Sequence, residues 1–201
     1  MDLNAVAGPV IGAVLPPMQV TVQVSAGQVP NAAGDGGEVP AYETPGAVSA
    51  ATIAGNVLTV SGSVTAGVLA AGQTIAGPGV APGTLITDQL SGPPGGAGTY
   101  SLNNQQTVTP AVAMTTSLVL NGSVQPMTWR DLQQLDGVNV EGARWKIYLE
   151  GQVDGVVRPE KKGGDLVVIS SGPHAGTWLV GQVLEQFPNW VCAAIVLQNQ
   201  F

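Results

Sequence analysis

The sequence predicts an all-β protein: a small β-barrel with one short helix, interrupted by an inserted β-sandwich or barrel-like module. Three observations lead to this fold class. The chain is rich in turn-forming residues, with 28 Gly and 15 Pro among 201 residues. Its hydrophobic content of 44% is enough for a core, and its many Val, Thr, Ile and Leu residues are atypical of a disordered chain. Strand-length stretches alternate with turn signals, as in sandwiches and barrels.

The uneven distribution of charge predicts the domain organisation. Only 9% of the residues are charged, against about 25% in typical domains. All six basic residues lie between Arg130 and Lys162, and the only charged side chain between Gly46 and Ser117 is Asp88. We therefore expect a discontinuous barrel domain, residues 1–45 and 118–201, and an uncharged module, residues 46–117. An insert whose ends lie close together fits into a surface loop at small entropic cost.

The N-terminal region predicts a helix, a strand and a loop. Apolar residues at roughly helical spacing favour a short helix over Asp2–Leu15. Apolar and polar residues alternate over Met18–Val24, as in a strand with one buried face. Asn31–Glu38 is a Gly-rich loop, and Val39–Thr44 is extended.

The uncharged module predicts short strands joined by Gly and Pro turns. Signals such as Gly55-Asn56 and Gly77-Pro78-Gly79 recur at the spacing typical of a small sandwich or barrel. The expected strands are Ala51–Ile53, Val57–Ser61, Thr74–Ala76, Thr84–Gln89, Gly98–Leu102 and Val108–Met114.

The region after Ser117 carries the clearest local signals. Thr128 and Asp131 have the spacing of a capping box and predict a helix over Trp129–Asp136, which Gly137 ends. Asp154-Gly155 is a hairpin turn signal. In the strand Glu141–Glu150, one face holds Ala143, Trp145, Ile147 and Leu149 and the other holds Arg144, Lys146, Tyr148 and Glu150. The other expected strands are Leu118–Val124, Asp165–Ser170, Thr177–Phe187 and Val191–Gln198, with a polar loop at Arg158–Gly164.

Composition disfavours several classes of function. The net charge of −7 argues against a protein that wraps nucleic acid, because such binding needs a basic surface. A single cysteine, Cys192, allows no internal disulfide. The apolar start lacks the basic region of a secretory signal, and no run of 18 apolar residues predicts a membrane helix. We expect a protein made in a reducing cytoplasm.

The residues predict no enzyme, no cofactor and no metal site. His174 lies near Ser170 and Ser171, but the spacing selects no acid to orient it, so a solvated turn histidine is favoured. Cys192 lies in an apolar run and is expected to be a small buried hydrophobe. One His and one Cys cannot make a closed zinc site, and the acidic residues near Gly34 lack the calcium-loop pattern.

Short motifs follow one another along the predicted barrel domain. They read Gly122-Ser-Val-Gln-Pro-Met-Thr-Trp-Arg-Asp-Leu132, Asp136-Gly-Val-Asn-Val140, Lys146-Ile-Tyr148, Val156-Val-Arg158, Lys162-Gly-Gly-Asp-Leu166 and Trp178-Leu-Val180. Their order and spacing resemble the small head-closure (stopper) proteins of tailed-bacteriophage necks. The resemblance implies a structural virion protein at the head–tail junction, assembled in the host cytoplasm.

The resemblance also implies the partners. Such proteins form a ring, commonly six-fold, between a portal or adaptor protein on the head side and a tail terminator or tail tube protein on the tail side. The ring helps to retain packaged DNA, which passes through without sequence-specific binding, and it contacts no membrane. Loops that project into the channel gate it, and by position these are Asn31–Glu38 and Val153–Gly164. The candidate channel-facing acidic residues are Asp35, Glu38 and Glu43.

Residues 130–162 hold six basic and six acidic side chains, a balance typical of a subunit interface or of a solvated face. All four Trp residues lie after residue 128, where they form a barrel core or, in one or two cases, anchor an interface. The candidate subunit-interface residues are Arg130, Arg144, Lys146, Arg158, Lys161, Lys162 and Trp129.

A second set of motifs covers Ala51–Thr115. It reads Gly55-Asn-Val-Leu-Thr-Val60, Gly72-Gln-Thr-Ile-Ala-Gly-Pro-Gly-Val-Ala-Pro-Gly-Thr-Leu-Ile86, Gly96-Ala-Gly-Thr-Tyr-Ser-Leu102 and Gln106-Thr-Val108. These motifs resemble a β module of phage structural and fibre proteins. They leave open an alternative, a tail fibre or baseplate protein whose module binds host surface glycans on a polar, aromatic-poor surface that includes Tyr100 and Asn103-Asn104. A cell-wall hydrolase is disfavoured, because the chain lacks paired carboxylates in a recognisable motif.

Overall fold

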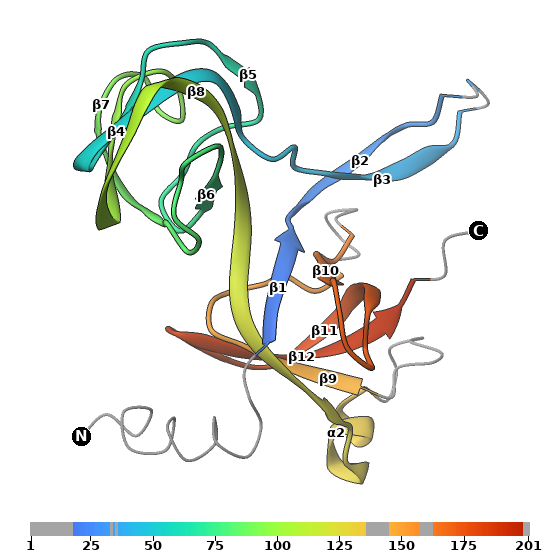
Figure 1. The fold of residues 1–201 in the computed structure, drawn as a ribbon. Coiled ribbons are helices and arrows are strands. Elements are labelled where there is room, and N and C mark those ends of the chain that lie inside the picture. Colours follow the sequence, from blue (N-terminus) through green and yellow to red (C-terminus); the bar gives the residue numbers. More distant parts are fainter. Residues whose placement is uncertain (1–17, 33, 35, 136–144, 157–162, 199–201) are drawn as a thin grey trace. The chain divides into compact units, whose positions relative to one another are not determined.

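A computed structural model describes residues 18–32, 34, 36–135, 145–156 and 163–198 (Figure 1). In this part the protein is all-β with one short helix, which confirms the predicted fold class. The chain divides into two compact units. Unit 1 comprises Met1–Tyr42 and Leu120–Phe201, and unit 2 comprises Glu43–Val119. The helix expected over residues 2–15 lies outside the described residues.

Unit 1 is built around an antiparallel sheet that curls into a ring. Along the sheet the order is β1, β10, β11, β12, β9 and the last part of β8, and an additional pairing of β1 with β8 joins the ends of this row. The ring therefore has the connectivity of a small barrel. Its strands are β1 (Met18–Gln23), β8 (Thr99–Pro126), β9 (Trp145–Leu149), β10 (Leu166–Ile169), β11 (Gly176–Phe187) and β12 (Trp190–Leu197).

The core of unit 1 includes one of the two faces predicted for β9. Ile147 and Leu149 of β9 are buried, as are Val167 and Ile169 of β10. In β12, by contrast, five successive residues from Val191 to Ile195 are buried. A strand is buried in this way when both of its faces are covered. On one face Ala194 packs with Leu135 and with the partly buried Met127, Leu184 and Val196.

Helix α2 (Trp129–Gln134) begins at the predicted capping box. The backbone N–H of Asp131 donates to Thr128 Oγ1, and the backbone N–H of Thr128 donates to Asp131 Oδ2 at 2.7 Å. The helix ends at its C-cap, Leu135, slightly before the predicted end at Asp136. The Gly137 expected to stop it lies outside the described residues.

Two features of this region depart from the simple pattern. Lys146 lies on the face opposite Ile147 and Leu149 but is also only 8% exposed, and its ammonium group forms an ion pair with Asp131 of helix α2. Asp154-Gly155 does not form a hairpin turn, since residues 152–156 contain no strand. This segment instead bonds to two others: the carbonyl of Asp154 accepts from the N–H of Asp165, and the N–H of Val156 donates to the carbonyl of Gly181.

A separate two-stranded hairpin follows β1. Strands β2 (Ser25–Pro30) and β3 (Glu38–Tyr42) pair with each other in a sheet of their own (Figure 1). The loop predicted over Asn31–Glu38 follows β2, except that its last residue, Glu38, begins β3 and pairs with Pro30. Strand β2 was not predicted, because Gly27 and Pro30 give its sequence a low strand propensity.

Unit 2 contains four strands and the first part of β8. They are β4 (Ala47–Val60), β5 (Val64–Ala66), β6 (Thr74–Ala76) and β7 (Ile86–Ser91). Strand β8 pairs with β4, β6 and β7, and β5 pairs with β4. Two strands predicted at residues 51–53 and 57–61 form the single strand β4, which passes through Gly55 at a positive φ of 64°.

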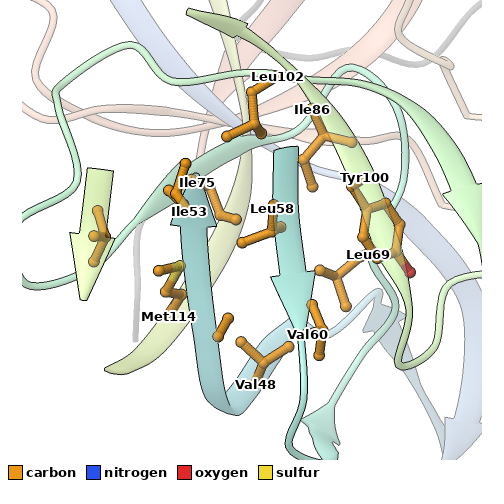
Figure 2. Packing of buried hydrophobic residues seen from close by; sticks show 12 residues of the cluster. Val48, Ile53, Leu58, Val60, Leu69, Ile75, Ile86, Tyr100, Leu102 and Met114 are labelled. Carbon is orange, nitrogen blue, oxygen red and sulfur yellow. The ribbon is translucent and has the colours of Figure 1, made fainter. Parts of the chain in front are cut away.

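The core of unit 2 draws residues from β4, β6, β7 and β8 and from the segment after β5, and Val64 of β5 packs against it while partly buried (Figure 2). The buried cluster consists of Val48, Ala51, Ile53, Leu58, Val60, Leu69, Ile75, Ile86, Tyr100, Leu102, Val108 and Met114. Almost all are aliphatic, and the one aromatic ring, Tyr100, directs its hydroxyl to the carbonyl of Gly96. An uncharged sequence can therefore form a closed core without ion pairs.

Strand β8 is a single strand of 28 residues that contributes to both units. The sequence predicted three separate strands, Gly98–Leu102, Val108–Met114 and Leu118–Val124. Irregular pairing with β4 between Gly55 and Val57 lies opposite the first apparent break, at residues 103–107, and the polar residues Thr115, Thr116 and Ser117 form the second. The boundary expected at Ser117/Leu118 lies within this strand, close to the division of the units at Val119/Leu120.

Candidate functional site

The two segments expected to gate a channel are anchored at one buried carboxylate, Asp165. Its side chain is 3% exposed. Oδ1 accepts the backbone N–H of Ser25, the first residue of β2, at 2.8 Å, and Oδ2 accepts the backbone N–H of Asp154 at 2.7 Å. Asp165 therefore joins the root of the β2–β3 hairpin to the segment between β9 and β10.

Backbone hydrogen bonds and a neighbouring glycine hold Asp165 against β11. The backbone N–H of Val180 in β11 donates to the carbonyl of Asp165, and the N–H of Asp165 donates to the carbonyl of Asp154. At the preceding position, Gly164 lies so close to the carbonyl of Val180 that a Cβ would clash with it. In the Lys162–Leu166 motif, Gly164 therefore lets the chain approach β11 closely, and Asp165 places its carboxylate beside the N–H groups of Ser25 and Asp154.

Tyr42 lies on the opposite strand of the hairpin, and the charge of the same carboxylate affects its hydroxyl group. It pairs with Ser25 across the hairpin. Burial raises the pKa of the Tyr42 hydroxyl, and the negative charge of Asp165 raises it further. The Asp165 carboxylate accepts two backbone N–H groups and so fixes the segments that carry them.

A second polar cluster holds helix α2 against β9. Lys146 Nζ donates to Asp131 Oδ2 at 2.8 Å, and the hydroxyl of Thr128 donates to the same oxygen. Burial alone would raise the pKa of Asp131, but the hydrogen bonds from Lys146 and Thr128 and the charge of Lys146 lower it overall. Burial would lower the pKa of Lys146, yet its bonds to Asp131 and Tyr148 raise it overall. Both groups are therefore held in their charged forms.

The predicted interface residues fall into three groups. Trp129, 75% exposed, and Arg130 lie exposed on helix α2. Lys146 is engaged within the chain by Asp131. Arg144, Arg158, Lys161 and Lys162 lie outside the described residues. Of the seven, only Trp129 and Arg130 are therefore placed on a described surface.

The predicted channel-facing acidic residues belong to different units. Glu38 lies at the start of β3 and is exposed. Glu43 is exposed between β3 and β4 and belongs to unit 2. Asp35 lies outside the described residues. Glu38 is therefore part of the hairpin in unit 1, whereas Glu43 is part of unit 2.

An aromatic cluster that the sequence did not predict lies at the turn between β11 and β12. The rings of Phe187 and Trp190 stack with centroids 4.5 Å apart, and the ring centroid of Tyr148 lies 6.0 Å from that of Trp190. Lys146 Nζ lies 5.5 Å from the ring centroid of Tyr148. The turn Pro188-Asn189 is the signal that could have revealed the cluster, because a tight turn places its two flanking residues opposite each other.

The lone His and Cys have structural surroundings. His174 is partly buried rather than fully solvated, because its ring packs edge-on against Trp145 at 4.5 Å and its carbonyl accepts from Trp178 Nε1. Cys192 is buried as predicted, and burial raises its thiol pKa. Among the described residues, no group of three or more His, Cys, Asp or Glu side chains could hold a metal ion. In the same part of the chain, no helix is long and apolar enough to span a membrane.

The residues named for glycan binding in unit 2 have internal roles. Tyr100 is buried in the core rather than exposed. Asn103 accepts the N–H of Leu85 and donates to the carbonyl of Gly83. Asn104 and Gln106 both donate to the buried hydroxyl of Thr84. These amides hold the Ala81–Leu85 turn; Tyr100 is therefore not available at the surface, whereas Asn103 remains exposed.

Comparisons with known proteins do not assign this arrangement. No family model matches the chain, and the searches of curated proteins and of solved structures give no match. The described features with a bearing on function are the hairpin anchored at Asp165 and the exposed Trp129 on α2.

Proposed function

We propose that this protein is a structural component of a tailed-phage neck, forming a ring that closes the head and joins it to the tail. The observation that carries the proposal is the order of the head-closure-like motifs along unit 1. They begin on the end of β8 and continue through α2, β9, the segment before β10, and β11. The motifs thus follow one compact unit from strand to strand.

The physical roles of the motif residues support this proposal. Thr128 and Asp131 cap α2, Asp165 anchors the hairpin root, and Gly164 allows close packing against β11. Each role is architectural. A protein selected to be a rigid part of an assembly needs such roles, and none of them requires a substrate or a cofactor.

The charge of the chain suits a ring around DNA. The net charge of −7 disfavours tight binding to phosphates, so DNA would slide past rather than stick. In this proposal the ring is a homo-oligomer, commonly six-fold. A portal or adaptor protein contacts one side, and a tail terminator or tail tube protein contacts the other.

Localisation in the particle tests the proposal directly. An epitope tag or gold label on the protein should appear at the head–tail junction, and a particle reconstruction should contain a ring of its density there. Phage that lack the protein should fill heads but fail to retain DNA or attach tails. A label found on distal fibres would contradict the proposal.

A charge test addresses the channel. Replacing Asp35, Glu38 and Glu43 by Lys should slow DNA ejection, and the effect should weaken as salt increases, because added bases attract the phosphates. The control is Asp88→Lys, which adds a base at an exposed position of unit 2. Unchanged ejection in the triple variant would refute an acidic inner wall.

A further inference from the structure

Strand β7 is an edge of the sheet in unit 2. It pairs with β8 on one side. On the other side, the backbones of Gly72 and Gln73 bond to Ile86, the first residue of β7. Beyond Ile86, the part of the chain that the structure describes provides no second strand, so residues 87–91 form an open edge. The backbone N–H and C=O groups of such an edge can pair with a strand of another chain.

The sequence of this edge favours association. It reads Thr84-Leu-Ile-Thr-Asp-Gln-Leu90, which combines apolar and β-branched residues, contains no Pro and holds one charge. Segments of this composition pair readily with copies of themselves when an edge exposes them. Leu90 is 55% exposed and adds apolar surface to the edge.

Asp88 lies in the middle of this edge and is the only charged residue between Gly46 and Ser117. Its side chain is exposed, and its Oδ1 accepts the backbone N–H of Gln89 at 2.8 Å. The carboxylate therefore occupies one backbone donor of β7 and places a negative charge on the edge. The pairing of β7 with β8 is also irregular on both sides of Asp88 and Gln89, and charges and irregularities are two common features of edge strands that avoid association.

We infer that Asp88 prevents the β7 edge from pairing with the β7 edge of a second copy. An antiparallel pairing centred on residues 87–91 would place each Asp88 opposite Leu90 of the other copy and the two carboxylates on a diagonal. Diagonal side chains across a strand pair lie about 7–8 Å apart, which is within the Debye length of about 10 Å at 0.1 M salt. The two negative charges therefore repel each other.

A second copy is the partner against which this charge acts, because the two Asp88 side chains necessarily have the same sign. No other charge of residues 46–117 can supply the repulsion. Any assembly that holds several copies together raises their effective concentration, so an unguarded edge would be most harmful there. The inference concerns unit 2 alone and does not rest on the proposed neck function.

Sedimentation of the full-length protein at a series of concentrations tests the inference. Asp88→Asn removes the charge but keeps a side-chain oxygen that can accept the N–H of Gln89. Compared with the unmodified chain, this variant should lower the dissociation constant for self-association roughly tenfold or more, because a like charge across an interface strongly opposes pairing. The difference should shrink as salt increases. Since Asp88 is exposed, the fold should be retained, and a circular dichroism spectrum checks this.

Two further variants serve as controls. Glu185→Gln removes one negative charge at an exposed position of β11 and should leave self-association unchanged. Asp88→Lys alone should associate no more than the unmodified chain, because two Lys side chains also repel each other. A mixture of Asp88→Lys with the unmodified chain should associate more than either protein alone, since the charges on the two edges then attract.

Hydrogen exchange locates the contact. On association of Asp88→Asn, a peptide that covers residues 87–91 should exchange about tenfold more slowly than in dilute protein. The inference is overturned if Asp88→Asn self-associates no more than Glu185→Gln, or if it associates while exchange in this peptide is unchanged. It is also overturned if Asp88→Lys alone associates as strongly as Asp88→Asn, or if the mixture associates no more than its components, because the charge would then not be what keeps the edge unpaired.

Discussion

Replacing Asp165 by Asn tests the anchor of the hairpin most directly. The carboxylate accepts two backbone N–H groups, whereas an amide offers one oxygen and one NH₂ group. One of the N–H groups, that of Ser25 or that of Asp154, therefore loses its acceptor. A buried hydrogen bond to a charged group contributes about 1.5–3 kcal/mol, so the free energy of unfolding of unit 1 should fall by about that amount.

Tryptophan fluorescence during urea unfolding measures this loss in unit 1 alone, because all four Trp residues belong to that unit. With a urea dependence of roughly 1–3 kcal/mol per molar, the midpoint should fall by about 1 M. Hydrogen exchange should also accelerate about tenfold or more at the amide of Ser25 or Asp154. Glu185→Gln, at an exposed position of β11, makes the same change of charge and should shift the midpoint little. If Asp165→Asn matches this control in both measurements, the anchor is not what holds the hairpin root.

Three further predictions concern single groups. Lys146→Met should destabilise unit 1 at neutral pH, because Asp131 loses its ion-pair partner. Since the pKa of Asp131 is lowered, the difference in free energy of unfolding between the two proteins should be present above pH 3.8 and vanish as the pH falls through the lowered pKa, and a difference that does not change with pH would contradict the ion pair. Tyr100→Phe should lower the free energy of unfolding of unit 2 by about 1 kcal/mol through loss of the bond to Gly96, measured by calorimetry, and an unchanged transition would show that the hydroxyl contributes nothing. Cys192 should react with a thiol reagent at neutral pH far more slowly than a free cysteine, because burial raises its pKa. Denaturant should restore the rate, and a fast reaction in the folded protein would contradict this burial.

Signals that act over a few residues predicted the structure well. The capping box at Thr128 and Asp131 is complete within one helical turn, and the alternation that buries Ile147 and Leu149 is a property of one strand. Both could be recognised because neither depends on a distant segment.

Features that depend on distant segments could not be predicted. Burial of Lys146 requires Asp131, which alternation within the strand does not reveal. The role of Asp165 depends on Ser25, which is 140 residues away along the chain. The hairpin itself was missed because Gly27 and Pro30 weaken the strand signal of β2, whereas pairing with β3 determines its conformation.

The continuity of β8 has a mechanical consequence. A load applied to unit 2 along this strand enters unit 1 through one unbroken backbone. There, residues Gly122–Pro126 are hydrogen-bonded to β9 in an antiparallel ladder. A pull along the axis of a strand loads all the bonds of such a ladder together, in shear, whereas a pull across it would break them one after another. The pairing of β8 with β9 should therefore resist a pull along β8 much better than a pull of the same force across it.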